Sequence, residues 1–225
     1  MKKKVVALLF VIAVVVATLV ITKYNDISAY YTHSDNKLNS FSAGELEVTV
    51  TEPNYVDNQI MKPNETIAKD PTYSNTGTVD GYIRAQIYAP ISKIKYVDGD
   101  ENIVTPEQDV EIFSYTLNSG WVAVEDNPSD TYKFNGIYED SKGNKYMVHT
   151  YKYMEGGIEK VVEPGETIQT PVFSSISTPN YLDTDTVVSL KMYATAIAVQ
   201  KEGGTAEEMW ERFKNQNQAG IVGVN

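Results

Sequence analysis

The sequence contains no cysteine, and only two of its 225 residues are histidine. Without cysteine the chain cannot use disulfide bonds, a thiolate nucleophile or a cysteine-ligated zinc ion. Cations are also scarce, because 19 Lys and Arg stand against 30 Asp and Glu, a net charge of −11. Nucleic acids and anionic membrane surfaces are bound by basic stripes, so we expect neither as a partner. The hydrophobic content of 42% excludes a fully disordered or collagen-like chain.

The first 29 residues have the features of a targeting segment. Lys2–Lys4 precede a 17-residue run, Val5–Ile21, that is apolar apart from Thr18; polar residues 22–26 follow, and Ile27-Ser28-Ala29 then provide small residues. A positive end, an apolar core and a small-residue cleavage point are typical of a signal peptide. We therefore predict cleavage between Ala29 and Tyr30, and contact with the membrane only through this segment. An N-terminal membrane anchor that is not cleaved is the alternative, because a spanning helix needs about 20 apolar residues.

Beyond residue 44, apolar and polar residues alternate in short runs, which is typical of strands that bury one face. Turn residues such as Asp98-Gly99-Asp100 separate these runs. The pattern predicts a mainly β fold, an antiparallel jelly-roll-like β-sandwich formed by residues 45–225 as one domain, with an elaboration at about residues 90–160. The predicted strands include residues 46–50, 82–88, 110–117, 121–124, 145–153, 158–162, 167–173 and 187–199.

One short helix is predicted near the C-terminus. Thr205-Ala206-Glu207-Glu208 is a capping box, in which Thr205 and Glu208 satisfy each other's backbone amides. Ala206, Met209, Trp210 and Phe213 then recur at helical spacing and form one apolar stripe. We expect this helix to pack on the edge of the sheet; a helix that binds a partner is the alternative.

The residues offer little support for catalysis or metal binding. His33 and His149 are far apart in the sequence, and neither belongs to a His-Glu-x-x-His motif, which places two imidazoles on one zinc ion. The nucleophile elbow, the phosphate-binding loop and the dinucleotide fingerprint are all missing. An EF-hand register that starts at Asp98 has Ile103 where glycine is required. We therefore predict no catalytic residue, no metal ligand and no cofactor, and calcium or zinc binding has no support.

Three stretches carry a family resemblance. Residues 27–44 combine a small residue, two aromatic residues, a Ser-Asp pair and an Asn-x-Phe-x-x-Gly pattern; Glu45–Pro53 then end in Thr-Glu-Pro. Lys69–Arg84 contain Lys-Asp-Pro, Asn-Thr-Gly and Tyr-Ile-Arg, and Tyr193–Trp210 end in Ala-Glu-Glu-x-Trp. In their order and spacing these stretches resemble the TasA/camelysin (CalY) family, cell-surface and biofilm-matrix proteins that Gram-positive bacteria export with a SipW-type signal peptidase.

The resemblance implies a secreted structural protein of the extracellular matrix or cell surface that assembles into fibres by donor-strand exchange. In such a fibre, the freed N-terminal segment of one subunit completes the sheet of the next subunit. Here that donor arm corresponds to residues 30–44, in which Tyr31, Leu38 and Phe41 are the side chains expected to fill apolar pockets. The implied partner is a homo-polymer joined through this arm, with other matrix proteins as further partners.

Two other functions compete with this interpretation. The first alternative is a camelysin-type surface metallopeptidase, because camelysin-like members of the family are classed as metallopeptidases. We assign no residue of this chain to that activity. A monomeric adhesin or ligand-binding sandwich is the other alternative, favoured if residues 90–160 expose a tyrosine-rich face. The sequence does not decide between fibre, peptidase and adhesin.

Overall fold

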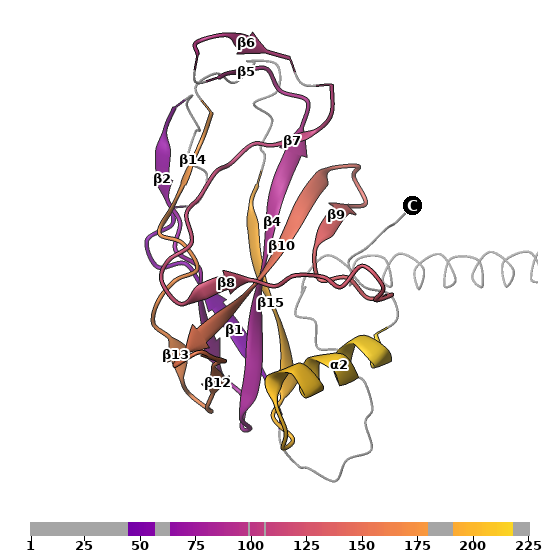
Figure 1. Cartoon of the computed structure of the whole chain (residues 1–225). Helices are drawn as coiled ribbons and strands as arrows, with labels where there is room; N and C mark the ends of the chain where they lie inside the picture. Colours follow the sequence, from indigo (N-terminus) through magenta and orange to yellow (C-terminus); the bar gives the residue numbers. More distant parts are fainter. Residues whose placement is uncertain (1–44, 57–63, 99, 106, 180–190, 218–225) are drawn as a thin grey trace, which may run out of the picture. The chain divides into compact units, whose positions relative to one another are not determined.

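The computed structural model describes residues 45–56, 64–98, 100–105, 107–179 and 191–217, without the side chains of residues 96 and 97 (Figure 1). These residues belong to one compact unit, Asp35–Asn225, which is separate from Met1–Ser34. The predicted signal peptide and donor arm lie outside the described residues. Within the described ranges, no helix is long and apolar enough to cross a membrane.

The largest sheet is organised around three long antiparallel strands, β4 (Gly81–Ser92), β10 (Lys145–Glu155) and β15 (Tyr193–Gln200) (Figure 1). β4 lies between the other two and pairs with both of them. β8 and β9 pair with β10, β11 forms a hairpin with its end, and β12 and β7 pair with the two ends of β4. The bounds of these short strands are Val110–Glu111 (β7), Trp121–Ala123 (β8), Gly136–Glu139 (β9), Ile158–Glu159 (β11) and Val161–Val162 (β12).

Smaller antiparallel sheets form the second layer and an outlying hairpin. One has the order β1-β3-β13, the second pairs β2 with β14, and the third is the hairpin of β5 and β6. Their bounds are Val48–Thr51 (β1), Thr66–Ala68 (β2), Thr72–Asn75 (β3), Tyr96–Val97 (β5), Ile103–Val104 (β6), Thr167–Ile168 (β13) and Ser175–Ser177 (β14).

Two apolar clusters lie on opposite faces of β4, because successive side chains of a strand point to opposite sides. Ile83 and Ile87 belong to the larger cluster, where they pack with second-layer residues such as Tyr73 and Ile168. Tyr82 belongs to the smaller cluster on the other face. Since the larger cluster joins the two layers, the mainly β, antiparallel prediction is confirmed. The jelly-roll order of the strands stays a prediction.

The predicted C-terminal helix is α2 (Ala206–Gln216). Its capping box is present: the Glu208 amide donates to Thr205 Oγ1 at 3.3 Å, and the Thr205 amide donates to Glu208 Oε2 at 2.9 Å. These two bonds satisfy amides that the helix itself leaves without acceptors, so a local sequence signal was sufficient to place the start of the helix.

α2 packs on a face of the large sheet, so the expectation that it packs on the sheet edge is wrong. Its buried stripe, which includes Met209 and Trp210, shares the smaller apolar cluster with Tyr82 of β4 and Ile197 of β15. The second layer packs on one face of β4 and α2 packs on the other, so β4 is buried along nearly its whole length. An edge position would have left Tyr82 and Ile197 exposed to water.

Several predicted strands are shorter than expected. The predicted strand at residues 110–117 is a strand only at β7, because the chain bends at Ile112 and Ser114 then pairs with Ser177 of β14 instead of with β4. The predicted strand at residues 167–173 is a strand only at β13, Thr167–Ile168. The predicted strand at residues 187–199 appears as β15, and its first four residues lie outside the described residues.

Candidate functional site

The base of the predicted donor arm is fixed to the turn that joins β3 to β4. The Glu45 amide donates to Thr78 Oγ1 at 2.9 Å, and the Thr78 amide donates to the Glu45 carbonyl at 2.6 Å. The Thr76 amide donates to the Glu47 carbonyl at 2.9 Å. A Cβ atom on Gly77 would collide with the Glu45 carbonyl oxygen, so only glycine allows this close approach. The chain therefore enters the domain at a defined place.

Asn75, the first residue of the Asn-Thr-Gly motif, is fully buried and hydrogen-bonded. Its Nδ2 donates to the carbonyls of Val79 and Val162 at 2.8 and 2.9 Å, and its Oδ1 accepts from the Gly77 amide at 3.0 Å. Its backbone also bonds the turn at Gly165–Glu166. A buried amide stays in place only when its polar atoms are paired, and this one joins three separate segments.

The Thr-Glu-Pro and Lys-Asp-Pro motifs meet at the end of β1. Lys69 is 3% exposed, and its Nζ lies 2.7 Å and 2.8 Å from the two carboxylate oxygens of Glu52. The ammonium also lies 4.2 Å from the centroid of the Tyr55 ring. The neighbouring Asp70 accepts from the backbone and side-chain amides of Asn54 at 3.0 and 2.6 Å. Both charged residues of the second motif thus fasten the chain that follows β1.

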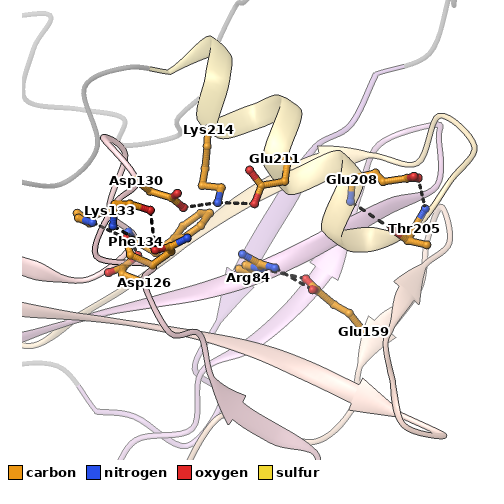
Figure 2. Close-up of polar contacts among 12 residues, drawn as sticks. Arg84, Asp126, Asp130, Lys133, Phe134, Glu159, Thr205, Glu208, Glu211 and Lys214 are labelled. Carbon is orange, nitrogen blue, oxygen red and sulfur yellow. Dashed lines mark hydrogen bonds and ion pairs between the residues drawn. The ribbon is translucent and has the colours of Figure 1, made fainter.

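Arg84 of the Tyr-Ile-Arg motif forms a buried ion pair with Glu159 of β11 (Figure 2). Arg84 Nε and Nη2 donate to the two carboxylate oxygens at 3.1 and 3.0 Å, and Trp210 Nε1 donates to Glu159 Oε1 at 2.8 Å. The guanidinium carbon lies 4.1 Å from the centroid of the Trp210 ring and 4.9 Å from that of Phe134. This cluster ties β4, β11 and α2 together.

The far end of α2 is held by a second polar contact (Figure 2). The Lys214 ammonium pairs with the carboxylates of Asp130 and Glu211. Partial burial lowers the pKa of Lys214, but these two carboxylates outweigh that effect and raise it above its ordinary value. The loop that carries Asp130 is itself fixed by Asp126, which accepts from the amides of Phe134 and Asn135 at 2.7 and 2.9 Å.

His149 pairs with a carboxylate. Its Nε2 lies 2.9 Å from each carboxylate oxygen of Glu111, on a partly exposed surface. His33 lies outside the described residues, and within them no three His, Asp or Glu residues are grouped as metal ligands. The pair of His149 and Glu111 alone lacks the three protein ligands typical of a catalytic zinc ion.

In the acidic loop that starts at Asp98, the Asp98 carboxylate accepts hydrogen bonds from backbone amides of the same loop. Asp98 Oδ1 accepts from the amides of Asp100 and Asn102, both at 2.9 Å. These bonds, that from the Asn102 amide foremost, lower the pKa of the Asp98 carboxyl. Asp109, at the end of the tested calcium register, pairs instead with Lys145 at 3.1 Å.

Sequence reasoning missed Glu159, which holds the Arg84 cluster together. A signal existed, because Arg84 stands among apolar residues in a strand that is predicted to be half-buried. An arginine at such a position needs a buried acid as a partner. Nothing in the sequence, however, indicates which of the 30 acidic residues takes that place.

A family model described as camelysin metallo-endopeptidase matches residues 1–101. The matched range contains the predicted signal segment and donor arm, and the four motifs that lie between Thr51 and Arg84. No curated protein and no solved structure matches the chain. The match therefore agrees with the resemblance that the motifs carry.

Proposed function

We propose that this chain is a secreted structural protein that assembles into fibres of the biofilm matrix; the match over residues 1–101 supports a TasA/camelysin-type protein. Proteins of this family are generally extracellular or cell-surface proteins. The proposed joint is the arm of residues 30–44, released when the bond between Ala29 and Tyr30 is cleaved.

The observation that carries this proposal is the fixed base of the arm. Residues 45–47 are held on the turn at Thr76–Thr78 by four backbone or side-chain hydrogen bonds. The chain then enters β1, an edge strand of the β1-β3-β13 sheet in the described part of the chain. A segment joined to a fixed point beside a sheet edge is well placed to reach a neighbour.

Addition of an extended strand to another sheet is driven by backbone hydrogen bonds, and pockets for alternate side chains give it specificity. Tyr31, Leu38 and Phe41 are the apolar side chains that the arm offers. A contact of this kind joins different surfaces of the two subunits, so repetition gives an open filament when the rotation does not close. Before cleavage the signal segment would keep the arm at the membrane, and processing would therefore control assembly.

Electrostatic repulsion opposes this assembly. Without residues 1–29 the chain has 15 cationic and 29 acidic side chains, a net charge of −14. Neighbouring subunits therefore repel one another, and salt or mild acid reduces that repulsion. We expect filaments to form more readily at mildly acidic pH than at neutral pH.

Negative-stain electron microscopy of the chain that begins at Tyr30 tests the proposal. Regular filaments are the expected result, and a matched chain that begins at Glu45 should give single particles. A second variant with Tyr31, Leu38 and Phe41 changed to serine keeps the length of the arm and should also fail to polymerise. Filaments from the chain without the arm would refute the joint, and single particles from all three would favour a monomeric adhesin.

The peptidase alternative rests on the description of the matching family. The structure places His149 against Glu111 and leaves it without a second imidazole in the described part of the chain. The test is casein cleavage by the purified chain. Activity that a chelator abolishes, and that both His33→Ala and His149→Ala reduce, would establish a metallopeptidase.

A further inference from the structure

Four tyrosines form a continuous row across the large sheet, on the face that α2 partly covers. Tyr193 of β15 stands opposite Tyr88 of β4, and Tyr146 of β10 stands opposite Tyr138 of β9. The ring centroids of Tyr88 lie 5.5 Å from Tyr138 and 6.4 Å from Tyr146, and Tyr146 lies 5.6 Å from Tyr193. The row therefore connects the two sides of the sheet through ring contacts.

The row is open to water chiefly at one end. Tyr193 is 45% exposed, whereas Tyr146 is 5% exposed. Tyr88 and Tyr138 are half-buried. Among the tyrosines whose side chains the structure describes, only Tyr193 is exposed. Burial and a hydrogen bond with Tyr193 raise the pKa of Tyr146 above its ordinary value, so the buried ring stays a neutral phenol.

We propose that Tyr193 is an oxidative cross-linking site at which two copies of this chain become joined by a dityrosine bond. The oxidant is a peroxidase that uses hydrogen peroxide. Each of two Tyr193 phenols gives up one electron and one proton, the two rings form a carbon–carbon bond at their ortho positions, and both rings regain aromaticity. One peroxide accepts the two electrons and two protons and leaves as two water molecules.

The row explains why Tyr193 is the site. A phenoxyl radical formed on any of the four rings can pass to a neighbour in contact, and a second molecule can reach only the exposed end. Tyr146 is a poor partner for Tyr193 within the same chain, because a direct bond requires the rings to come closer than 5.6 Å and Tyr146 is packed into the sheet. The chain has no cysteine, so disulfides cannot provide a covalent link between copies.

The experiment treats a mixture of unlabelled and ¹⁵N-labelled chain with horseradish peroxidase and hydrogen peroxide. Trypsin cuts after Lys191 and Lys201, so Tyr193 lies alone in the peptide Met192–Lys201. The expected product is this peptide linked to its own copy, two hydrogen atoms lighter than the sum, with mixed isotope labels. The labels distinguish a link between molecules from one within a molecule, and blue dityrosine fluorescence follows its yield.

Two variants make the test specific. Tyr193→Phe keeps the ring in the row but removes the phenol, and we expect the yield of covalent dimer to fall at least fivefold. Tyr138→Phe changes the same atoms at a half-buried position of the row and should leave the dimer yield within twofold. Added salt should raise the yield of the unmodified chain, because it screens the repulsion between acidic copies.

Three results would overturn the proposal: an unchanged dimer yield in Tyr193→Phe, linked peptides that lack residues 192–201, or a Tyr193 link that carries a single isotope label. None of these measurements requires filaments. The proposal therefore stands or falls independently of the donor arm.

Discussion

Replacement of Glu159 by glutamine should destabilise the fold by about 3 to 5 kcal/mol, because it leaves the buried guanidinium of Arg84 without a counter-charge. Arg84 and Glu159 are 5% and 6% exposed, so water cannot take over the lost interaction. Glutamine has nearly the same shape, but its amide group would face the N–H groups of Arg84 with donors of its own. The loss therefore measures charge and hydrogen bonding, and not a cavity.

Urea unfolding followed by tryptophan fluorescence measures this loss, with the slope against urea as a check that the unfolded state is unchanged. A variant with both Arg84→Met and Glu159→Leu should recover most of the stability, because apolar residues of similar volume leave no charge buried. The Trp210 indole would still lose its acceptor, which costs about 1 kcal/mol.

The exposed pair of Asp109 and Lys145 is the matched control. Asp109→Asn should cost less than about 1 kcal/mol, since water screens a surface ion pair. A Glu159→Gln loss as small as this one would refute the reasoning. So would a double variant that is less stable than either single variant.

Three further predictions concern the core, the base of the arm and the acid side of the stability profile. The Tyr73 hydroxyl is fully buried and has no hydrogen-bond partner among the described residues, so Tyr73→Phe should be neutral or stabilising in thermal unfolding. Tyr115→Phe, which breaks a 2.8 Å bond to the Tyr151 hydroxyl, should cost about 1 kcal/mol. Gly77→Ala places a methyl group against the Glu45 carbonyl and should speed proteolysis of the N-terminal segment in limited digestion. Partial burial raises the pKa of Glu166, but bonds from the Glu163 amide and the Lys160 ammonium outweigh it and lower the pKa below its ordinary value. The stability due to the Glu166 charge is therefore complete above its ordinary pKa of 4.5 and is lost as the pH falls through the lowered value. Glu166→Gln should flatten the pH dependence of the melting temperature there.

A different result would contradict each of these predictions. A Tyr73→Phe variant that melts lower than Tyr115→Phe would show that the Tyr73 hydroxyl is paired. Gly156→Ala is the control for Gly77→Ala, because a Cβ on Gly156 meets no neighbouring atom and only its positive φ of 59° is strained. Equal digestion of both variants would argue against the close approach at Glu45. A Glu166→Gln profile as steep as that of the unmodified chain would place the acid transition on other carboxyls.

Local patterns in the sequence were sufficient for the elements whose signal is local. The capping box placed the start of α2, and alternation placed β10 and the inward face of β15. Alternation failed after Glu111, because the chain bends at Ile112 and changes its pairing partner from β4 to β14, which a local pattern does not reveal. The face on which α2 packs could not be predicted either, since it depends on Tyr82 and Ile197, which are far apart in the sequence.

The motifs that carry the family resemblance have a structural role that the sequence alone does not reveal: their polar residues form internal contacts. Lys69 is paired with Glu52, Asn75 joins three segments, and Arg84 is enclosed by Glu159 and two aromatic rings. The polar atoms of these residues are engaged in internal contacts, so they hold strands together and are not available to a substrate. Contacts with partners are therefore expected at other parts of the chain. The proposed arm, which precedes Glu45 in the sequence, and the exposed end of the tyrosine row at Tyr193 are the two candidates.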